Sequence, residues 1–287
     1  MPLNISTELA VPFVVDIDQA KADFPEFEFV SALTPSEQKA AFHVRRGGED
    51  LCLKIIAPNH SLERAQREVA AMQEIDHPNV VKLVEYVFTS KGGRTTHYMV
   101  EEFIKGHDLA QDIRPGHCWP LEQVKKVFGE LCDGLSELRR RNIVHRDLKP
   151  NNIRIRENGS PVIIDFGLAR MLDLDSLTQT GMKVGTPLYF SPEQCVGDKH
   201  SIDHRTDLYA LGAIMFQATT GKHPCHTART VDELFQAVCE GVKISHDTDF
   251  SSLPDGLKMI ITRLLEKERS RRPVSADLVA KLLRGIQ

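Results

Sequence analysis

The sequence predicts an α+β protein in which a small antiparallel sheet with one helix precedes a larger, mainly helical part. Apolar residues alternate with polar ones in short runs from Phe27 to Phe103, the pattern of strands. From Leu121 onward they recur at every third or fourth position, the spacing of one face of a helix. A chain of 287 residues is long enough for two lobes with separate cores.

Strand-forming segments fill the first part of the chain. We predict strands at residues 27–30, 40–44, 51–56, 80–88 and 96–103. Turns that contain paired glycines separate the second strand from the third and the fourth from the fifth. A helix over residues 62–75 is expected between the third and fourth strands, because its apolar residues fall roughly on one face.

Helical periodicity dominates the second part of the chain. A long helix is predicted over Leu121–Arg141, and a strongly apolar one begins at Asp207 and ends near Gly221. Further helices are predicted at residues 232–240, 257–266 and 276–283. No repeat or low-complexity linker interrupts the chain, so we expect no second independent domain.

Charge, cysteine content and hydropathy exclude several classes of protein. The 36 basic and 40 acidic residues give no polyelectrolyte character, so no nucleic acid is expected as a partner. The six cysteines are scattered without a C-x-x-C pair, which is typical of reduced thiols in a cytosolic protein. Residues 1–15 lack the basic start of a signal peptide, and no stretch approaches the roughly 20 apolar residues of a membrane span. We therefore expect a soluble, cytoplasmic protein with no membrane contact.

The segment from Ile143 to Asn152, I-V-H-R-D-L-K-P-N-N, places an acid, a base and an amide close together. We expect a loop between a helix and a strand, because Pro150 continues no helix and biases the residue before it away from helical backbone. A second carboxylate, Asp165, opens the sequence D-F-G directly after the apolar run Val162–Ile164. Asp and Asn also favour turns. The ordered pair of motifs is stronger evidence for a shared site than either motif alone.

H-R-D-L-K-P-N-N followed by D-F-G resembles the catalytic loop and magnesium motif of the protein kinases. The resemblance covers about Phe27–Leu283. It implies the bilobal protein-kinase fold, with an extension at residues 1–26, an N-lobe at 27–105 and a C-lobe at 106–287. The sequence leaves open whether the extension packs on the N-lobe or stays mobile.

The resemblance implies that ATP and Mg²⁺ are the cofactors. Asp147 would orient the attacking hydroxyl, Lys149 would offset charge on the γ-phosphate, and Asn152 and Asp165 would hold Mg²⁺. A lone lysine in a strand usually faces solvent, but Lys54 occupies the place of the kinase lysine that grips the phosphates. Its glutamate partner would come from the next helix. Glu68 matches that position, whereas Glu63 and Glu74 are interpreted as surface charges.

Other positions are assigned through the same resemblance. Backbone groups of Glu102 and Ile104 would meet the adenine edge, and Ala41 and Cys52 would lie above the base. Lys149 and the threonine of Gly185-Thr186-Pro187, Thr186, are similar to the residues found in Ser/Thr-directed kinases. The substrate would then be a protein with a Ser or Thr acceptor.

The stretch after Asp165 resembles an activation segment that ends in Ser191-Pro192-Glu193. In the family, an arginine such as Arg146 commonly receives a phosphate from this segment. Ser176, Thr178 and Thr180 are the available acceptors, and we predict autophosphorylation at Thr178 or Thr180. At least two of the three are expected to be ordinary loop hydroxyls. Glu193 would pair with Arg272, and Asp207 would hold the backbone of the catalytic loop.

The chain departs from the family in its phosphate loop, where Thr34, Ser36 and Lys39 stand in place of three glycines. Glycine lets backbone amides approach phosphate closely, and Pro35 has no N–H to donate. Two interpretations stay open. The chain would bind ATP more weakly, or Ser36 and Lys39 would replace the backbone contacts with side-chain ones.

Charged residues also occupy places that are usually apolar. Arg154 stands at the floor of the adenine site and Glu101 at the gatekeeper position. They would either be solvated or, if buried, need partners, with mutual pairing as one option. His223-Pro224-Cys225-His226 has metal-ligand residue types, but its spacing fits no standard zinc site and a loop is the better interpretation.

The sequence is best interpreted as an ATP- and Mg²⁺-dependent Ser/Thr protein kinase. One alternative is a pseudokinase that acts as a nucleotide-sensing or scaffolding module. The retention of Lys54, Glu68, Asp147, Asn152 and Asp165 argues against it. Another is a kinase-fold enzyme for small molecules, which the protein-type activation segment disfavours. The sequence leaves the oligomeric state open.

Overall fold

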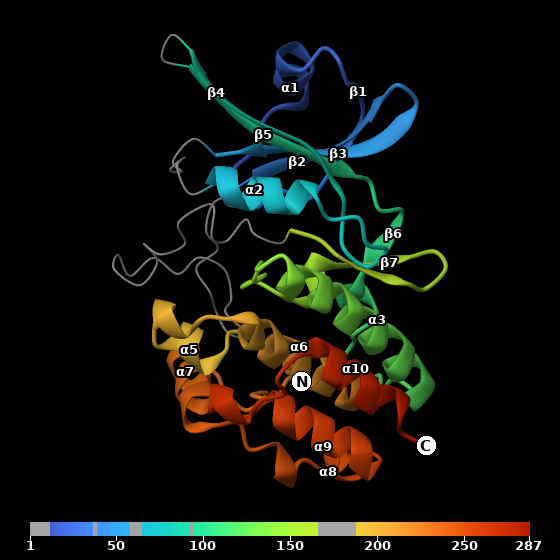
Figure 1. Ribbon diagram of the computed structural model, residues 1–287, viewed down its shortest axis with the longest axis vertical. Coiled ribbons are helices and arrows are strands. Elements are labelled where there is room, and N and C mark those ends of the chain that lie inside the picture. The colour runs from blue at the N-terminus through green and yellow to red at the C-terminus, as the bar shows by residue number, and fades with distance from the viewer. Residues whose placement is uncertain (1–11, 37–38, 58–64, 92–93, 166–187) are drawn as a thin grey trace.

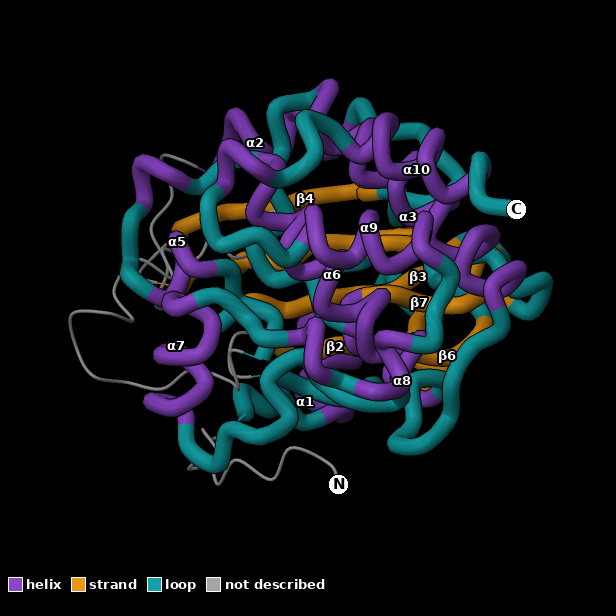
Figure 2. The backbone as a smooth tube through the Cα atoms, turned by 90° about the horizontal axis from the view of Figure 1, so that it is seen from below, coloured by secondary structure: helices purple, strands orange, loops and turns teal. Residues whose placement is uncertain are grey.

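The computed structural model describes residues 12–36, 39–57, 65–91, 94–165 and 188–287. At residues 65–68, 89–91 and 94–96 it describes the backbone alone. The described chain forms two lobes, with a twisted sheet and two helices in the first and mostly helices in the second (Figure 1). Seen from below, the helices of the second lobe lie in front of the strands (Figure 2).

Five antiparallel strands form the sheet of the first lobe, in the order β1-β2-β3-β5-β4. They are β1 (Glu28–Ala32), β2 (Lys39–Arg46), β3 (Glu49–Ile56), β4 (Leu83–Lys91) and β5 (Arg94–Glu102). Gly47 and Gly48, both at positive φ, make the turn between β2 and β3. All five predicted strands are present.

The fourth strand begins later than predicted. Val80 makes isolated bridges to His77 and Ile163, and the amide of Val81 donates to the carbonyl of Ile163 at 2.9 Å. These residues therefore pair with a strand of the second lobe, which the apolar pattern alone did not distinguish from a continuation of β4.

The two faces of the sheet differ in chemistry, because side chains alternate along each strand. One face buries Phe42, Leu53 and Val100 against an apolar cluster that includes Ala20 and Phe24. The other face carries Lys54 on β3 and Glu101 on β5, together with Ala41 and Cys52. Helix α2 (Ala65–Gln73) adds Val69 and Met72 to the main core, which also contains Ile56 and Met99.

The described part of the N-terminal extension packs on the sheet. It forms helix α1 (Ile17–Asp23), whose first turn is capped by Asp16, a carboxylate that accepts from the amides of Asp18 and Gln19. Ala20 and Phe24 are buried, and the Phe24 ring meets Tyr98 edge-on at 4.9 Å between centroids. Within its described residues, the first lobe thus has two helices, one more than predicted.

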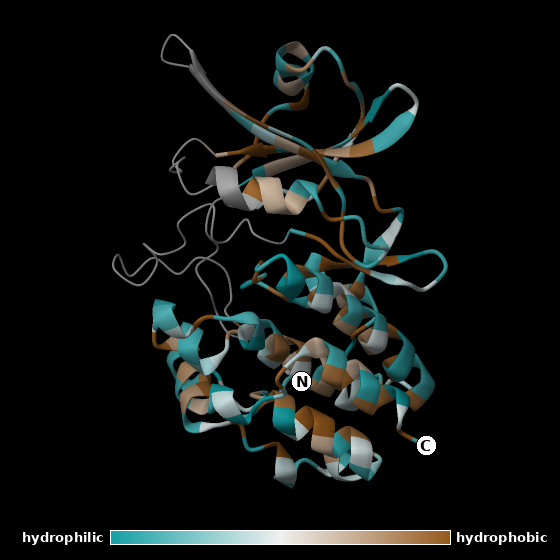
Figure 3. Cartoon of the chain, in the orientation of Figure 1, coloured by the Kyte–Doolittle hydropathy of each residue, from teal (hydrophilic) through white to brown (hydrophobic). Residues whose placement is uncertain are grey.

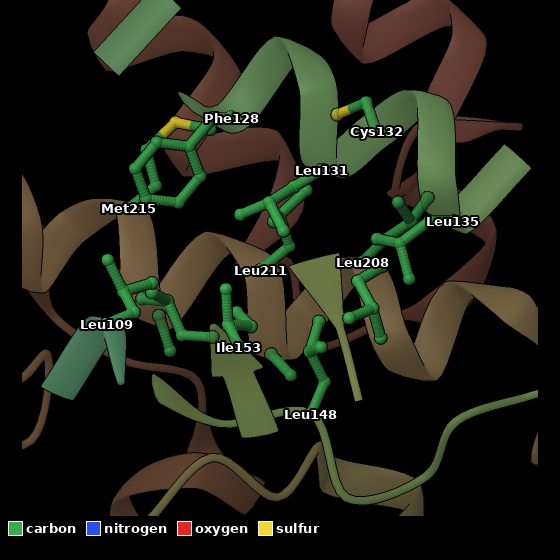
Figure 4. Packing of buried hydrophobic residues seen from close by; sticks show 14 of the residues in the cluster. Leu109, Phe128, Leu131, Cys132, Leu135, Leu148, Ile153, Leu208, Leu211 and Met215 are labelled. Carbon is green, nitrogen blue, oxygen red and sulfur yellow. The ribbon is translucent and has the colours of Figure 1, made fainter. Parts of the chain in front are cut away.

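The second lobe is built around helices α3 (Leu121–Arg140) and α6 (His204–Thr220). Phe128, Leu131 and Leu135 of α3 face Leu208, Leu211 and Met215 of α6, with Leu148 and Ile153 beside them (Figure 4). Gly212 lets α6 approach α9 closely, since a Cβ there would lie 2.6 Å from the Leu264 Cβ.

Smaller elements complete this lobe. They are α5 (Pro192–Cys195), α7 (Val231–Glu240), α8 (Thr248–Ser251), α9 (Asp255–Leu264), α10 (Ala276–Arg284), and 3₁₀ turns at Leu109–Gln111, Pro150–Asn152, Lys199–Ser201, Ile244–His246 and Arg269–Arg271. The helices of this lobe carry both hydrophobic and hydrophilic residues (Figure 3). A three-stranded sheet, β6 (Gly106–Asp108), β7 (Ile153–Arg156) and β8 (Pro161–Ile163), lies next to the first lobe.

Helix α6 begins earlier than predicted, because Asp203 caps it by accepting from the amide of Arg205. Asp207 therefore lies inside the first turn rather than at the start. The predicted end is confirmed: Gly221 adopts φ 67° and terminates the helix. Among the residues that the structure describes, none of the helices combines the length and apolar character needed to cross a bilayer.

Candidate active site

Asp207 holds the backbone of the loop between α3 and β7. One carboxylate oxygen accepts from the amide of His145 at 2.8 Å and the other from the amide of Arg146 at 2.9 Å. Asp207 is buried, and this burial raises the pKa of its carboxyl despite the two donors. The contacts fix Arg146 in a left-handed conformation, φ 66°, which few non-glycine residues adopt.

His145 connects this loop to the end of β8. Its Nδ1 accepts from the amide of Asp147 at 3.3 Å, which assigns the proton to Nε2, and Nε2 lies 2.9 Å from the carbonyl of Ile164. The amide of Ile164 in turn donates to the carbonyl of Asn152 at 3.0 Å. Ile164, the residue before Asp165, is therefore bonded to the loop through both its carbonyl and its amide.

Asp147, Lys149 and Asn152 converge on one another. The Lys149 ammonium donates to Asp147 Oδ2 at 2.7 Å. The Asn152 amide donates to the same oxygen at 3.0 Å and to the Asp147 carbonyl at 2.7 Å. The carboxylate is thereby oriented by a cation and an amide, and its side chain stays 37% exposed.

Asp165 forms ion pairs with lysines on two strands of the first lobe. Lys54 Nζ lies 2.7 Å from Asp165 Oδ1, and Lys39 forms an ion pair with the same oxygen. Lys54 also forms a buried ion pair with Glu101. The backbone at Asp165 is left-handed, φ 62°, a strained geometry of the kind that gathers at functional sites.

The charges of this cluster shift one another's pKa values. Burial disfavours the carboxylate of Asp165, but Lys39 and Lys54 outweigh it and lower the pKa. Burial likewise disfavours the ammonium of Lys54, yet Asp165 and Glu101 raise its pKa above the ordinary value. For Lys39, burial outweighs the attraction of Asp165 and lowers the pKa. Burial also raises the pKa of the nearby Cys52 thiol to about 11.

The glycine-poor loop is held by backbone hydrogen bonds. The amide of Leu33 donates to the Ala41 carbonyl at 2.8 Å, and that of Ser36 to the Lys39 carbonyl at 2.9 Å. The N-terminal extension also reaches it, because the amide of Phe13 donates to the Ser36 carbonyl at 2.8 Å. The loop is thus connected to the extension and, through Lys39, to Asp165.

The two unusual charges do not pair with each other, so that option is wrong. Glu101 is buried and Arg154 is partly buried, and each has an oppositely charged partner, as the sequence analysis expected of a buried charge. Glu101 is 3% exposed and pairs with Lys54, its diagonal neighbour on the sheet. Arg154 lies opposite Asp108 in the β6–β7 pair and donates to it at 2.8 Å. Each of the two charges is therefore paired with an opposite charge on its own sheet.

The segment that links the lobes contains Glu102 and Ile104. The amide of Glu102 donates to the Lys82 carbonyl at 3.0 Å, and its carboxylate accepts from the Lys82 amide at 3.0 Å. Arg154 donates to the Ile104 carbonyl at 3.2 Å, so a guanidinium from the second lobe fixes this segment.

Glu193 and Arg272 form the buried pair that the sequence predicts. The guanidinium donates to both carboxylate oxygens at 2.8 Å, and the Thr206 hydroxyl adds a third bond at 2.8 Å. The guanidinium carbon also lies 4.9 Å from the centre of the Tyr209 ring. Burial favours the neutral acid at Glu193, but Arg272 outweighs it and lowers the pKa.

Several predicted site residues lie outside the described part of the chain. These are the side chain of Glu68 and the residues Ser176, Thr178, Thr180 and Thr186. Arg146 is described, and its carbonyl accepts from the Gln194 amide at 2.7 Å.

Gln194 was missed by the sequence analysis. It also forms a capping box with Ser191. The S-x-x-Q spacing before a helix is the signal that would have found it.

His223 is structural. Its ring nitrogens contact the Leu188 carbonyl at 2.8 Å and the Cys225 amide at 3.1 Å, and burial lowers its pKa to about 4. No group of three or more potential metal-binding His, Cys, Asp or Glu side chains occurs within the described ranges. The loop interpretation of this motif agrees with these contacts.

Comparisons with known proteins found related sequences over most of the chain. A model of the protein kinase domain matches residues 41–282. Serine/threonine-protein kinase pkn2 of Myxococcus xanthus is 34% identical over 228 residues, which are 77% of this chain and 27% of that protein. Serine/threonine-protein kinase pkn3 of the same organism is 29% identical over 252 residues, 81% of this chain and 43% of that protein.

A third relative, serine/threonine-protein kinase PknB of Mycobacterium leprae, is 30% identical over 223 residues, 77% of this chain and 35% of that protein. The aligned regions span between 27% and 43% of the lengths of these three relatives. The domain match covers most of the chain and contains Lys54, Asp147, Asn152 and Asp165. The chain belongs to the protein kinase family.

Proposed function

We propose that the chain transfers the γ-phosphoryl group of ATP to a Ser or Thr hydroxyl of a protein. The observation that carries the proposal is the convergence of Lys54 from β3 on Asp165 at 2.7 Å. Asp147, Lys149 and Asn152 lie on the adjoining loop, joined to residue 164 through His145 and Asn152. Phosphoryl transfer needs positioning and charge neutralisation, and these residues supply both.

Asp147 would accept a hydrogen bond from the attacking hydroxyl and take its proton late in the transfer. Lys149 and Asn152, which already donate to this carboxylate, would keep it aimed. As oxygen approaches phosphorus, Lys149 would turn toward the transferring group and offset its charge.

Asp165 and Asn152 would hold Mg²⁺. The donor set fits this ion, since carboxylate and amide oxygens are its preferred protein ligands. The Asn152 NH₂ group donates to Asp147, which leaves the amide oxygen as the atom suited to a cation. Held by these two residues, Mg²⁺ would supply positive charge that offsets the negative charge of the phosphates.

Residues of the first lobe would bind the phosphates of ATP. Lys54 would contact the first two phosphates, with Glu68 as a partner from α2. Ser36 and Lys39 would replace the missing glycine contacts, and the direct ion pair of Lys39 with Asp165 supports this assignment. Backbone groups of Glu102 and Ile104 would meet the adenine edge, with Ala41 and Cys52 above the base.

Regulation is proposed at the segment between Asp165 and Leu188. Thr178 or Thr180 would be autophosphorylated, with Ser176 as a further acceptor and Arg146 as the phosphate-binding cation. Thr186 and Lys149 would favour Ser and Thr as acceptors. We also propose the boundaries 1–26, 27–105 and 106–287 for the extension and the two lobes, and a cytoplasmic location.

The test is incubation of the whole chain with labelled ATP, Mg²⁺ and a generic basic protein. The Asp147→Asn variant is the control, and it should lower transfer by about a hundredfold or more. Transfer by the wild type to a small molecule alone would favour the small-molecule alternative. No transfer, together with a nucleotide-dependent rise in melting temperature, would favour the pseudokinase instead.

A further inference from the structure

Glu101 is a buried carboxylate in the middle of the sheet. The register pairs Cys52 with Glu101 and Lys54 with Met99, so Lys54 and Glu101 are diagonal neighbours on one face. Their side chains are 5% and 4% exposed, and they form an ion pair. Burying an unpaired carboxylate costs several kcal/mol of folding free energy, and the ion pair with Lys54 offsets part of that cost.

The pair belongs to a chain of alternating charges. Lys39 contacts Asp165, Asp165 contacts Lys54, and Lys54 contacts Glu101. An ammonium has three donors, so Lys54 can serve both of its carboxylates at once. Without Glu101, the ammonium would retain Asp165 as its remaining described carboxylate partner, and that residue is the proposed metal ligand.

We propose that Glu101 is a positioning residue that holds Lys54 in place from within the sheet. This rests on the proposed function, in which Lys54 contacts the phosphates. The expected partner, Glu68, belongs to α2, a helix that joins the lobe by side-chain packing of residues such as Val69 and Met72. Glu101 instead lies on the part of β5, Tyr98–Glu102, that pairs with β3, the strand that carries Lys54. Lys54 and Glu101 are therefore placed by two paired strands, and their contact does not depend on the position of α2.

The first test compares Glu101→Gln with the wild type and with Glu85→Gln. Glu85 is a matched control: it lies on β4 in the same sheet and pairs with Arg46 and Tyr98 instead of the site. Glu101→Gln should lower kcat about tenfold without raising KM for ATP, because it misplaces Lys54 but removes a negative charge near the phosphates. Glu85→Gln should leave both constants unchanged, and Glu68→Gln should lower kcat less than Glu101→Gln does.

A conservative variant separates position from charge. Glu101→Asp keeps the carboxylate but shortens its reach by one methylene, so a positioning role predicts a several-fold loss of kcat. A role in charge balance alone predicts activity near that of the wild type. Melting temperatures measured alongside show whether any loss merely follows unfolding.

A second readout does not depend on phosphate transfer. An adenosine sulfonyl fluoride reacts with a neutral lysine amine to form a sulfonamide, with release of fluoride and a proton, and peptide mapping locates the label. Glu101→Gln should label several-fold more slowly at Lys54, because an amine that is no longer held by Glu101 lies less often within reach of the sulfonyl group. Glu85→Gln should label at the wild-type rate. If the wild type transfers no phosphate, the proposed function fails while this labelling still tests the role of Glu101.

Two results would overturn the inference. One is an unchanged kcat and labelling rate in Glu101→Gln. The other is a loss of kcat in Glu68→Gln that exceeds the loss in Glu101→Gln.

Discussion

Lys39 and Asp165 form an ion pair between β2 and the residue that follows β8 by two positions. Lys39 stands where the family has a glycine, and its side chain contacts Asp165, the proposed metal ligand. It explains how a loop without glycines can still present a positive charge to phosphate, since an ammonium reaches where a backbone amide cannot.

Removing this ammonium should weaken nucleotide binding. We expect Lys39→Met to raise KM for ATP about tenfold, because a charge-assisted contact contributes on the order of 1.5–3 kcal/mol. Steady-state kinetics over an ATP series measures this. Lys258→Met, which removes a lysine of α9 paired with Asp255, should leave KM unchanged. An unaltered KM in Lys39→Met would show that the loop does not use this side chain.

Breaking the buried Glu193–Arg272 ion pair should destabilise the second lobe. Glu193→Gln leaves the fully buried Arg272 without its anion, so we expect a loss of about 3–5 kcal/mol in the free energy of unfolding. Urea unfolding at pH 7 measures it, and Glu233→Gln on the exposed side of α7 serves as the control. A change below 1 kcal/mol would argue that the pair contributes little.

The Glu193–Arg272 ion pair should also make part of the free energy of unfolding sensitive to acid. Arg272 lowers the pKa of Glu193 below its ordinary value of 4.5, so the folded state favours the carboxylate. Its contribution is complete above about pH 4.5 and is lost as the pH falls through the lowered pKa. Urea midpoints between pH 6 and pH 3 should therefore decline more steeply for the wild type than for Glu193→Gln. Parallel profiles would contradict this linkage.

His223 should make the protein sensitive to mild acid. Its pKa falls from 6.5 to about 4 on folding, so the unfolded chain binds the proton first. Stability should then decrease between pH 6.5 and pH 4, by about 3 kcal/mol in total at 1.4 kcal/mol per unit. Unfolding of wild type and His223→Gln at pH 7 and pH 5 checks this. His226→Gln, which removes an exposed imidazole nearby, should keep most of the wild-type dependence, because burial is the main cause of the lowered His223 pKa.

The N-terminal extension should affect nucleotide binding through the Phe13–Ser36 hydrogen bond. Deletion of residues 1–14 removes that donor but keeps α1, so we expect KM for ATP to rise a few-fold while the melting temperature changes little. Phe24→Ala provides the contrast. It empties a site in the apolar cluster and should lower stability by about 3–5 kcal/mol. Equal KM values for the truncated and whole chains would exclude a role for the extension.

Local sequence patterns predicted most of the secondary structure and the residues at the centre of the candidate site. Strand alternation found all five strands of the first lobe, and helical periodicity found α3, α7, α9 and α10 to within a few residues. Asp147, Lys149, Asn152 and Asp165 come from two short motifs, which explains why the sequence placed them together. The boundaries of β4 and α6 were missed, because they depend on a cross-lobe bridge at Val80 and on the cap at Asp203.

The partners of charged residues were the hardest to predict. Glu101 and Arg154 each pair with a residue distant in sequence, Lys54 and Asp108, and those pairings follow from strand register. Register is a tertiary property that one strand's composition does not specify. The role of residues 12–26 was undecided for the same reason, since it depends on a backbone contact with the phosphate loop.

The left-handed backbone of Asp165 determines which inactive variant is informative. Alanine is strained at φ 62°, so Asp165→Ala would disturb the chain around the site as well as remove the carboxylate. Asparagine tolerates this geometry and keeps the shape of the side chain. Asp165→Asn is therefore the variant that we expect to lose activity with the least disturbance of the backbone, and the one best suited to trapping substrates.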